Sequence, residues 1–158
     1  MKEIKGLFSI IPDYPGLNIC LVDDGSFDVC DDFVKLCEEK EAILFLKDVK
    51  GRYKDLESSQ YLKVEKFDFE DRRYNNHSVL YDFIFLCCDV PKDKRVDVLK
   101  KFYRVLKNAG NIYLFFEDDP IDIRGLLESV NYVAVNEIDS IGNRHIVSAK
   151  KMHGWMKV

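Results

Sequence analysis

Short apolar runs alternate with amphipathic segments along this sequence, and that order constrains the fold more than any other feature. Nearly continuous apolar runs, typical of strands buried on both faces, occupy residues 17–22, 42–46, 81–87 and 112–116, with a weaker run at 64–67. Residues 29–37 and 96–106 instead carry apolar side chains at three-and-four spacing, which indicates amphipathic helices. This alternation predicts parallel strands joined by right-handed crossovers, with helices on both faces of the sheet.

The last part of the chain departs from this alternation. Residues 123–130 indicate a short helix, and β-rich runs follow at residues 132–138 and 144–149. Residues 139–143 lie between these runs and have the composition of a hairpin turn. The sequence therefore predicts an α/β protein with a Rossmann-like, doubly wound, mostly parallel seven-stranded sheet that ends in a C-terminal antiparallel hairpin.

Three local features are also expected. Asp28 is placed to cap the helix that starts near Val29, because Asp is a preferred N-cap residue. Residues 49–59 are polar and are expected to carry a short helix. Residues 107–110 are expected to end the helix before the strand at 112–116, because they place a Lys near its negative end and a Gly beyond it.

Length and charge limit the classes of protein that fit. The 158 residues suit one domain over residues 1–158, and 47% apolar residues are enough to build a core. A net charge of -4 gives no general attraction to nucleic acid. The N-terminus lacks the apolar run of a signal peptide, and no segment approaches the roughly 20 apolar residues that span a bilayer. We therefore expect a cytoplasmic protein without membrane contact.

The cysteines and histidines give no sign of a metal site. The five cysteines are odd in number, form no C-x-x-C pair and lie mostly in apolar stretches: Cys20, Cys30, Cys37, Cys87 and Cys88. This pattern favours buried thiols in a reducing compartment over a zinc site or a reactive thiol. The three histidines have no metal-ligand spacing either, so no metal is expected.

Polar and acidic residues follow the predicted strands. The residues of interest are Asp23, Asp24, Gly25, Asp48, Asp68 and Asp89. In doubly wound sheets, ligands bind beyond the carboxyl ends of the strands, close to the point where the strand order reverses. The sequence therefore predicts that these residues line one rim of the sheet, which is the expected ligand site.

Several stretches resemble class I S-adenosylmethionine-dependent methyltransferases. Residues 67–71 (FDFED) resemble the acidic segment after the third strand of that family, and residues 81–85 (YDFIF) resemble its fourth strand. Residues 103–112 (YRVLKNAGNI) resemble its passage into the fifth strand, with Asn108 and Ala109 replacing the usual Pro-Gly. The closing hairpin matches its antiparallel sixth and seventh strands. The resemblance covers nearly the whole chain from Leu17 and implies S-adenosylmethionine as the cofactor.

The glycine-rich loop of that family is degenerate here. The family has an acidic residue and then a G-x-G-x-G-type loop after the first strand, whereas residues 21–27 of this chain read LVDDGSF. Only Gly25 remains, Leu21 stands at the acidic position, and Phe27 replaces a small residue, which places a ring toward the cofactor cleft. Glycines let the backbone turn tightly and approach a ligand closely. Two interpretations stay open: the cofactor site is eroded, or Asp23 or Asp24 supplies the negative charge that the ammonium and sulfonium groups need.

The resemblance also implies roles for three further acids. Asp48, at the end of the second strand, corresponds to the acid that accepts hydrogen bonds from the ribose hydroxyls, and Asp68 corresponds to an adenine-side residue. Asp89 lies in residues 87–91 (CCDVP), where amino-methyltransferases carry an [Asp/Asn]-Pro-Pro-aromatic motif. It is the candidate base or orienting group. Cys88 is disfavoured as a nucleophile because a buried thiol at a strand end is inert.

The preferred functional interpretation is a methyltransferase-fold protein with an eroded cofactor site, weakly active or acting as a non-catalytic module that binds a small molecule or a protein. The alternative is an active methyltransferase with a divergent donor loop, since methyl transfer depends mostly on proximity. A nicotinamide-binding domain is disfavoured because no G-x-G-x-x-G follows the first strand. A receiver domain is disfavoured because no Lys follows the fifth strand. The sequence identifies neither the acceptor nor the oligomeric state.

Overall fold

The computed structural model describes residues 2–13, 15–70 and 80–152. In this part of the chain the helices are α1 (Lys2–Leu7), α2 (Cys30–Lys40), α3 (Arg95–Val105) and α4 (Pro120–Ser129), with the short 3-10 helices η1 (Phe8–Ile10) and η2 (Lys92–Lys94). The strands are β1 (Asn18–Asp23), β2 (Ile43–Asp48), β3 (Leu62–Lys66), β4 (Tyr81–Cys87), β5 (Leu106–Phe116), β6 (Tyr132–Ile141) and β7 (Arg144–Lys151).

The strands form one sheet in the order β3-β2-β1-β4-β5-β7-β6. Strands β1 to β5 pair in parallel, whereas β7 runs antiparallel to both β5 and β6. Strand β1 lies between β2 and β4, so the strand order reverses there. The mostly parallel, doubly wound seven-stranded sheet with a C-terminal hairpin is therefore confirmed.

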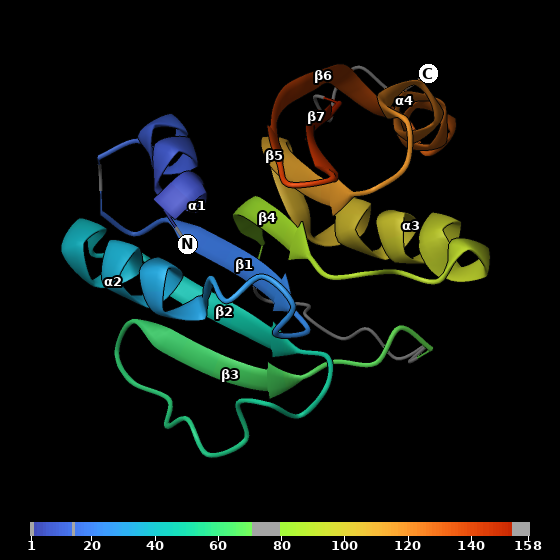
Figure 1. Ribbon diagram of the computed structural model, residues 1–158. Coiled ribbons are helices and arrows are strands. Elements are labelled where there is room, and N and C mark those ends of the chain that lie inside the picture. Colours follow the sequence, from blue (N-terminus) through green and yellow to red (C-terminus); the bar gives the residue numbers. More distant parts are fainter. Residues whose placement is uncertain (1, 14, 71–79, 153–158) are drawn as a thin grey trace.

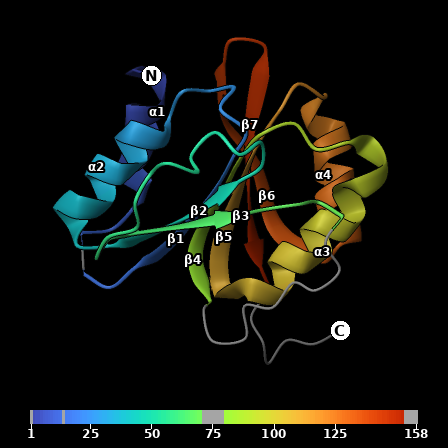
Figure 2. The ribbon, with the colours of Figure 1, turned by 90° about the horizontal axis from the view of Figure 1, so that it is seen from below.

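Helices cover both faces of the sheet. Helices α1 and α2 lie on one face, and α3 and α4 lie on the other (Figures 1 and 2). The side chains of each central strand alternate between the two layers, as the pleat of a strand requires. Cys20 and Val22 of β1 face α3 and α4, whereas Ile19 and Leu21 face α1 and α2. This double burial explains why the central strands are continuous apolar runs in the sequence.

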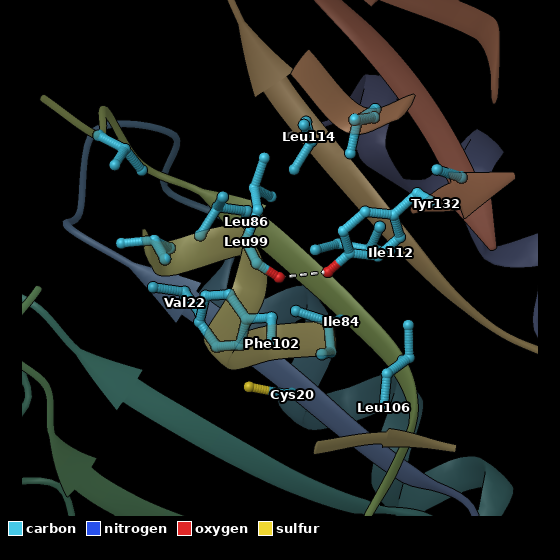
Figure 3. Close-up of a cluster of buried hydrophobic side chains, with 14 of the residues drawn as sticks. Cys20, Val22, Ile84, Leu86, Leu99, Phe102, Leu106, Ile112, Leu114 and Tyr132 are labelled. Atoms are coloured by element: carbon cyan, nitrogen blue, oxygen red, sulfur yellow. Dashed lines mark hydrogen bonds between the residues drawn. The ribbon is translucent and has the colours of Figure 1, made fainter. Parts of the chain in front are cut away.

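The layer beneath α3 and α4 is closed by a buried tyrosine. Phe102 and Leu99 of α3 pack with Ile84 and Ile112, and the Tyr132 hydroxyl of β6 donates a hydrogen bond to the Leu99 carbonyl oxygen at 2.8 Å (Figure 3). Burial raises the pKa of Tyr132 above its ordinary value, so the hydroxyl stays a donor. The edge strand β6 is thereby fixed to a helix on one face of the sheet.

Two sequence-based boundaries were wrong. Asp28 does not cap α2: Val29 is the N-cap residue without a side-chain cap, and Asp28 has a φ of 52°. Strand β5 begins at Leu106 rather than at residue 112, because Leu106 already pairs with Tyr81 and a bulge follows between Tyr81 and Phe83. Residues 107–110 therefore belong to the strand and do not end a helix.

Residues 49–59 also contain no helix, contrary to expectation. They form turns. The Asp48 carboxylate accepts the backbone N–H groups of Arg52 and Tyr53, and Gly51 has a φ of 70°, which an α-helix does not allow. Conversely, helix α1 was not predicted from the sequence, and its Ile4 and Leu7 are buried against the α2 face. Across the described residues, no helix is long and apolar enough to cross a membrane.

Candidate functional site

The carboxyl ends of three adjacent strands form the core of the site. Asp23 ends β1, Asp48 ends β2 and Cys87 ends β4, and Asp23 is in register with both neighbours. The loops that leave these strands therefore start side by side, at the point where the strand order reverses. This is the rim on which the sequence analysis placed the ligand site.

Asp23 is fully buried, and its carboxylate is held by groups of the chain itself. One oxygen accepts the Tyr53 hydroxyl at 2.6 Å, and the other accepts the Gly25 backbone N–H at 2.9 Å. Burial raises the pKa of Asp23, and the two hydrogen bonds counteract part of that rise. The pKa of Tyr53 is also raised, mainly by burial and then by the hydrogen bond to Asp23. Asp23 and Tyr53 thus form a closed polar pair under the rim.

Asp48 is also buried, and its carboxylate is hydrogen-bonded within the protein. Only 3% of it is exposed, and its two oxygens accept the backbone N–H groups of Arg52 at 3.0 Å and Tyr53 at 2.9 Å. These hydrogen bonds shape the turn that brings the Tyr53 hydroxyl to Asp23. Both oxygens that the resemblance assigned to ribose hydroxyls therefore already accept hydrogen bonds from the protein.

Arg52 covers the one glycine that remains in the first loop. Gly25 has a φ of 85°, and a Cβ atom placed on it would lie 2.4 Å from the Cδ and Nε atoms of Arg52. In a donor loop, glycine leaves room for a ligand to approach the backbone. Here the side chain of Arg52 fills that room, so the β2–β3 connection folds over the loop that follows β1.

Asp24 and Asp89 join the β1 loop to the end of β4. Asp24 accepts hydrogen bonds from the backbone and hydroxyl of Ser26 and, at 3.3 Å, from the backbone N–H of Asp89. The Asp89 carboxylate forms a two-pronged ion pair with Arg144 of β7, at 2.6 and 3.1 Å. That contact lowers the pKa of Asp89, so it is a weaker base than an ordinary aspartate.

Arg144 also holds Phe27. Its guanidinium carbon lies 4.9 Å from the centre of the Phe27 ring, and the ring packs edge-on against Phe115 at 5.5 Å. Arg144 further donates to the Phe115 carbonyl oxygen at 3.1 Å. The expectation that Phe27 enters the cofactor cleft was wrong: the ring belongs to the buried layer beneath α1 and α2.

Asp68 lies apart from the other candidates. It is exposed beyond β3, and its carboxylate accepts the Glu70 backbone N–H at 2.9 Å. In the described part of the chain no hydrogen bond or ion pair joins it to Asp23, Asp24, Asp48 or Asp89. The structure therefore brings four of the five predicted acids together through their loops and leaves Asp68 in a turn of its own.

The cysteines offer no reactive thiol at this rim. All five are buried and free. Burial raises the pKa values of Cys87 and Cys88 well above the ordinary value, and nearby carboxylates raise them further. Within residues 2–13, 15–70 and 80–152, no group of three His, Cys, Asp or Glu side chains is placed to hold a metal ion. Thiolate chemistry is therefore disfavoured at this site.

The residues that sequence reasoning missed are Arg52, Tyr53 and Arg144. No local pattern singles them out, because each acts on a residue far along the chain: Tyr53 on Asp23 and Arg144 on Asp89. Together they contact three of the residues that the resemblance assigned to the site: Asp23, Gly25 and Asp89. The buried acids are thus hydrogen-bonded within the protein, and the Arg52 side chain lies over Gly25.

No family model matches the sequence, and no curated protein matches it. Solved structures do match. An O-methyltransferase family protein from Burkholderia thailandensis has a TM-score of 0.69 and 11% identity over 97% of this chain and 56% of its own. A TehB-like S-adenosylmethionine-dependent methyltransferase from Corynebacterium glutamicum has a TM-score of 0.69 and 14% identity, covering 95% and 86%.

A human N-acetylserotonin methyltransferase, solved in complex with S-adenosylmethionine, matches with a TM-score of 0.61 and 13% identity over 85% of this chain. The chain spans only 56% of the Burkholderia protein and 47% of the human one, about half of each. At these identities the likeness concerns the backbone arrangement alone. The chain thus has the class I S-adenosylmethionine-dependent methyltransferase-like fold.

Proposed function

We propose that this chain is a methyltransferase-fold binding module whose methyl-donor site is closed by its own side chains. One observation carries the proposal: Tyr53 bonds the buried Asp23 while Arg52 covers Gly25. Both side chains come from the connection after β2, and both lie against residues at the end of β1 and in the loop after it, where the resemblance places the donor site. In this proposal the protein binds a small molecule or a protein partner and does not catalyse methyl transfer.

The contacts of Arg52 and Tyr53 oppose the binding of a donor molecule at the rim. A donor molecule at this rim has to displace Arg52 and separate Tyr53 from Asp23. Losing a hydrogen bond to a charged group costs about 1.5–3 kcal/mol, which lowers affinity by a factor of roughly 10 to 150. S-adenosylmethionine offers its ammonium and sulfonium groups in return. Burial, however, raises the pKa of Asp23 and so disfavours the ionised carboxylate that would attract these groups. The closed arrangement is therefore favoured over the bound one.

Asp89 supports the same conclusion on the acceptor side. A general base works best with a pKa near the working pH. Arg144 lowers the pKa of Asp89 and occupies both of its oxygens. Deprotonation of an acceptor by Asp89 would first require Arg144 to leave.

Calorimetric titration of the wild-type protein with S-adenosylmethionine and S-adenosylhomocysteine tests the proposal. We expect no binding up to about 1 mM ligand, the concentration that corresponds to roughly 4 kcal/mol of binding free energy. Circular dichroism establishes that the titrated protein is folded. Micromolar binding to the wild type would overturn the proposal and favour the alternative, an active methyltransferase with a divergent donor loop.

A double variant distinguishes a closed site from one that never existed. In Arg52→Ala/Tyr53→Phe both occupants of the loop are truncated, and we expect S-adenosylhomocysteine binding to become measurable. The matched control is Arg124→Ala/Tyr61→Phe, whose two positions lie outside the rim. If neither double variant binds, closure by Arg52 and Tyr53 is not the reason for the missing affinity, and that part of the proposal fails.

A further inference from the structure

A second candidate site lies on α3, away from the closed rim. A groove of about 590 Å³ runs between α3 and the segment after β3, and its walls are Phe69, Glu70, Lys94, Asp97, Lys100, Lys101 and Arg104. Four of these side chains are cationic and two are acidic, which leaves an excess of positive charge. The whole chain carries a net charge of -4, so the groove has the opposite sign to the molecule.

Two of the four cationic side chains form contacts with residues of the groove wall. Lys94 pairs with Glu70 at 2.9 Å, and that hydrogen bond raises the pKa of Lys94. Lys101 donates to the Phe69 carbonyl oxygen at 3.3 Å, which ties α3 to the segment after β3. These contacts neutralise Glu70 and hold the two walls together.

Lys100 and Arg104 carry the remaining charge. Both are exposed, and no residue in the described ranges forms an ion pair with either one. They stand one helical turn apart, where like charges destabilise a helix by a few tenths of a kcal/mol. Asp97 lies one turn before Lys101 and offsets only part of this repulsion. An anion bound between Lys100 and Arg104 would relieve it.

The remaining wall is aromatic. Phe69 is partly buried and packs edge-on against Phe67 at 5.4 Å, while Phe67 stacks on Phe102 of α3. The Phe69 ring is therefore fixed from behind and has an apolar surface in the groove. A groove lined by cations and a fixed ring suits a compact anion that also carries an apolar part.

We propose that this groove binds a phosphorylated small molecule, with Lys100 and Arg104 contacting its phosphate groups and Phe69 contacting its apolar part. The guanidinium group suits phosphate because it donates two parallel hydrogen bonds, and Lys adds a point charge. The proposal does not depend on the closure by Arg52 and Tyr53, since the groove is lined by residues of η2, α3 and the segment after β3. A small anion is favoured over nucleic acid because the chain as a whole is acidic.

The test is a calorimetric titration of the full chain with inorganic pyrophosphate and with adenosine diphosphate, each at low and at high salt concentration. The variant Lys100→Gln/Arg104→Gln removes the two charges and keeps good helix formers. The control Lys35→Gln/Arg124→Gln removes the same charges from α2 and α4, outside the groove. We expect the groove variant to bind both probes about tenfold more weakly or worse, because charge-assisted hydrogen bonds contribute on this scale.

The control should keep the wild-type affinity, and added salt should weaken wild-type binding. Phe69→Ala should weaken the binding of adenosine diphosphate more than the binding of pyrophosphate, because only adenosine diphosphate has an apolar part to contact the ring. The proposal is overturned if the wild type binds neither probe at millimolar concentration, or if the groove variant and the control lose affinity equally. Binding of a short single-stranded RNA without binding of either small probe would also overturn it and would assign the groove to nucleic acid.

Discussion

Single side chains at the rim determine how the protein responds to pH. The folded state raises the pKa of Asp23 above the ordinary value of 3.8, mainly through burial, and lowers that of Asp89 through Arg144. A raised pKa contributes stability that is present below the ordinary value and is lost as the pH rises through the folded value. A lowered pKa contributes stability that is present above the ordinary value and is lost as the pH falls. The two aspartates therefore act in opposite directions.

Comparison of each aspartate with its asparagine variant tests this sign. Relative to Asp23→Asn, the wild type should lose stability as the pH rises above 3.8, because its buried carboxyl must ionise. Relative to Asp89→Asn, the wild type should lose stability as the pH falls below 3.8, because protonation of Asp89 breaks the pair with Arg144. Urea denaturation of the three proteins from about pH 2 to 8 covers both windows and measures both differences. If both differences in the free energy of unfolding changed with pH in the same direction, the opposite pKa shifts of Asp23 and Asp89 would be contradicted.

Gly25 provides a second residue-scale test. Gly25→Ala should destabilise the protein by about 1–3 kcal/mol, because the backbone is left-handed there and the new Cβ meets Arg52. Gly51→Ala is the control, since its φ of 70° is similar and nothing lies within 4 Å of the added atom. Part of the cost at Gly25 should disappear in an Arg52→Ala background, whereas the cost at Gly51 should not change. Thermal denaturation of the double-mutant cycle gives the coupling.

At the scale of elements, the C-terminal hairpin is fastened to the middle of the sheet at both ends. Tyr132 of β6 bonds α3, and Arg144 of β7 bonds Asp89 beyond β4. Only 12% of the Arg144 side chain is exposed, whereas 67% of the Asp89 side chain is, so solvent screens the ion pair from the Asp89 side. Arg144 therefore links β7, β4 and the loop after β1.

Arg144→Gln should loosen this link. We expect a loss of about 1–2 kcal/mol, because the solvent-screened ion pair and the contact with Phe27 both disappear. Hydrogen exchange should become faster in the β6–β7 turn and in residues 24–29 together. Lys150→Gln, an exposed change on the same strand, should leave both segments protected. Faster exchange in the hairpin alone would show that Arg144 does not restrain the β1 loop.

At the scale of the whole molecule, the two buried layers share every central strand. Phe33 of α2 packs on Phe85 of β4, while Phe102 of α3 lies against the opposite face of the sheet. Neither layer can be lost while the other remains packed, because the same strands supply both. Phe33→Leu and Phe102→Leu should therefore each shift a single unfolding transition. Far- and near-ultraviolet circular dichroism should report the same midpoint, and separate midpoints would indicate two independent layers.

The sequence predicted what depends on periodicity and left out what depends on distant contacts. Continuous apolar runs gave β1, β2, β4 and the second half of β5, because burial on both faces leaves that pattern. Asp23 and Asp48 could be placed at strand ends for the same reason. The turn after β2 was missed because Asp48 binds the backbone of Arg52 and Tyr53 in place of a helix. Arg144 was missed because its partner lies 55 residues away.

That separation of 55 residues has a consequence in time. A ribosome that adds 5–20 residues per second needs roughly 3–11 s to go from Asp89 to Arg144. During this interval Phe27 and the end of β4 have already been synthesised, while the guanidinium group that covers them does not yet exist. A newly made chain therefore exposes an aromatic ring beside an unpaired carboxylate for several seconds. In this interval a chaperone or a folding partner can reach the Phe27 ring, which the finished protein buries.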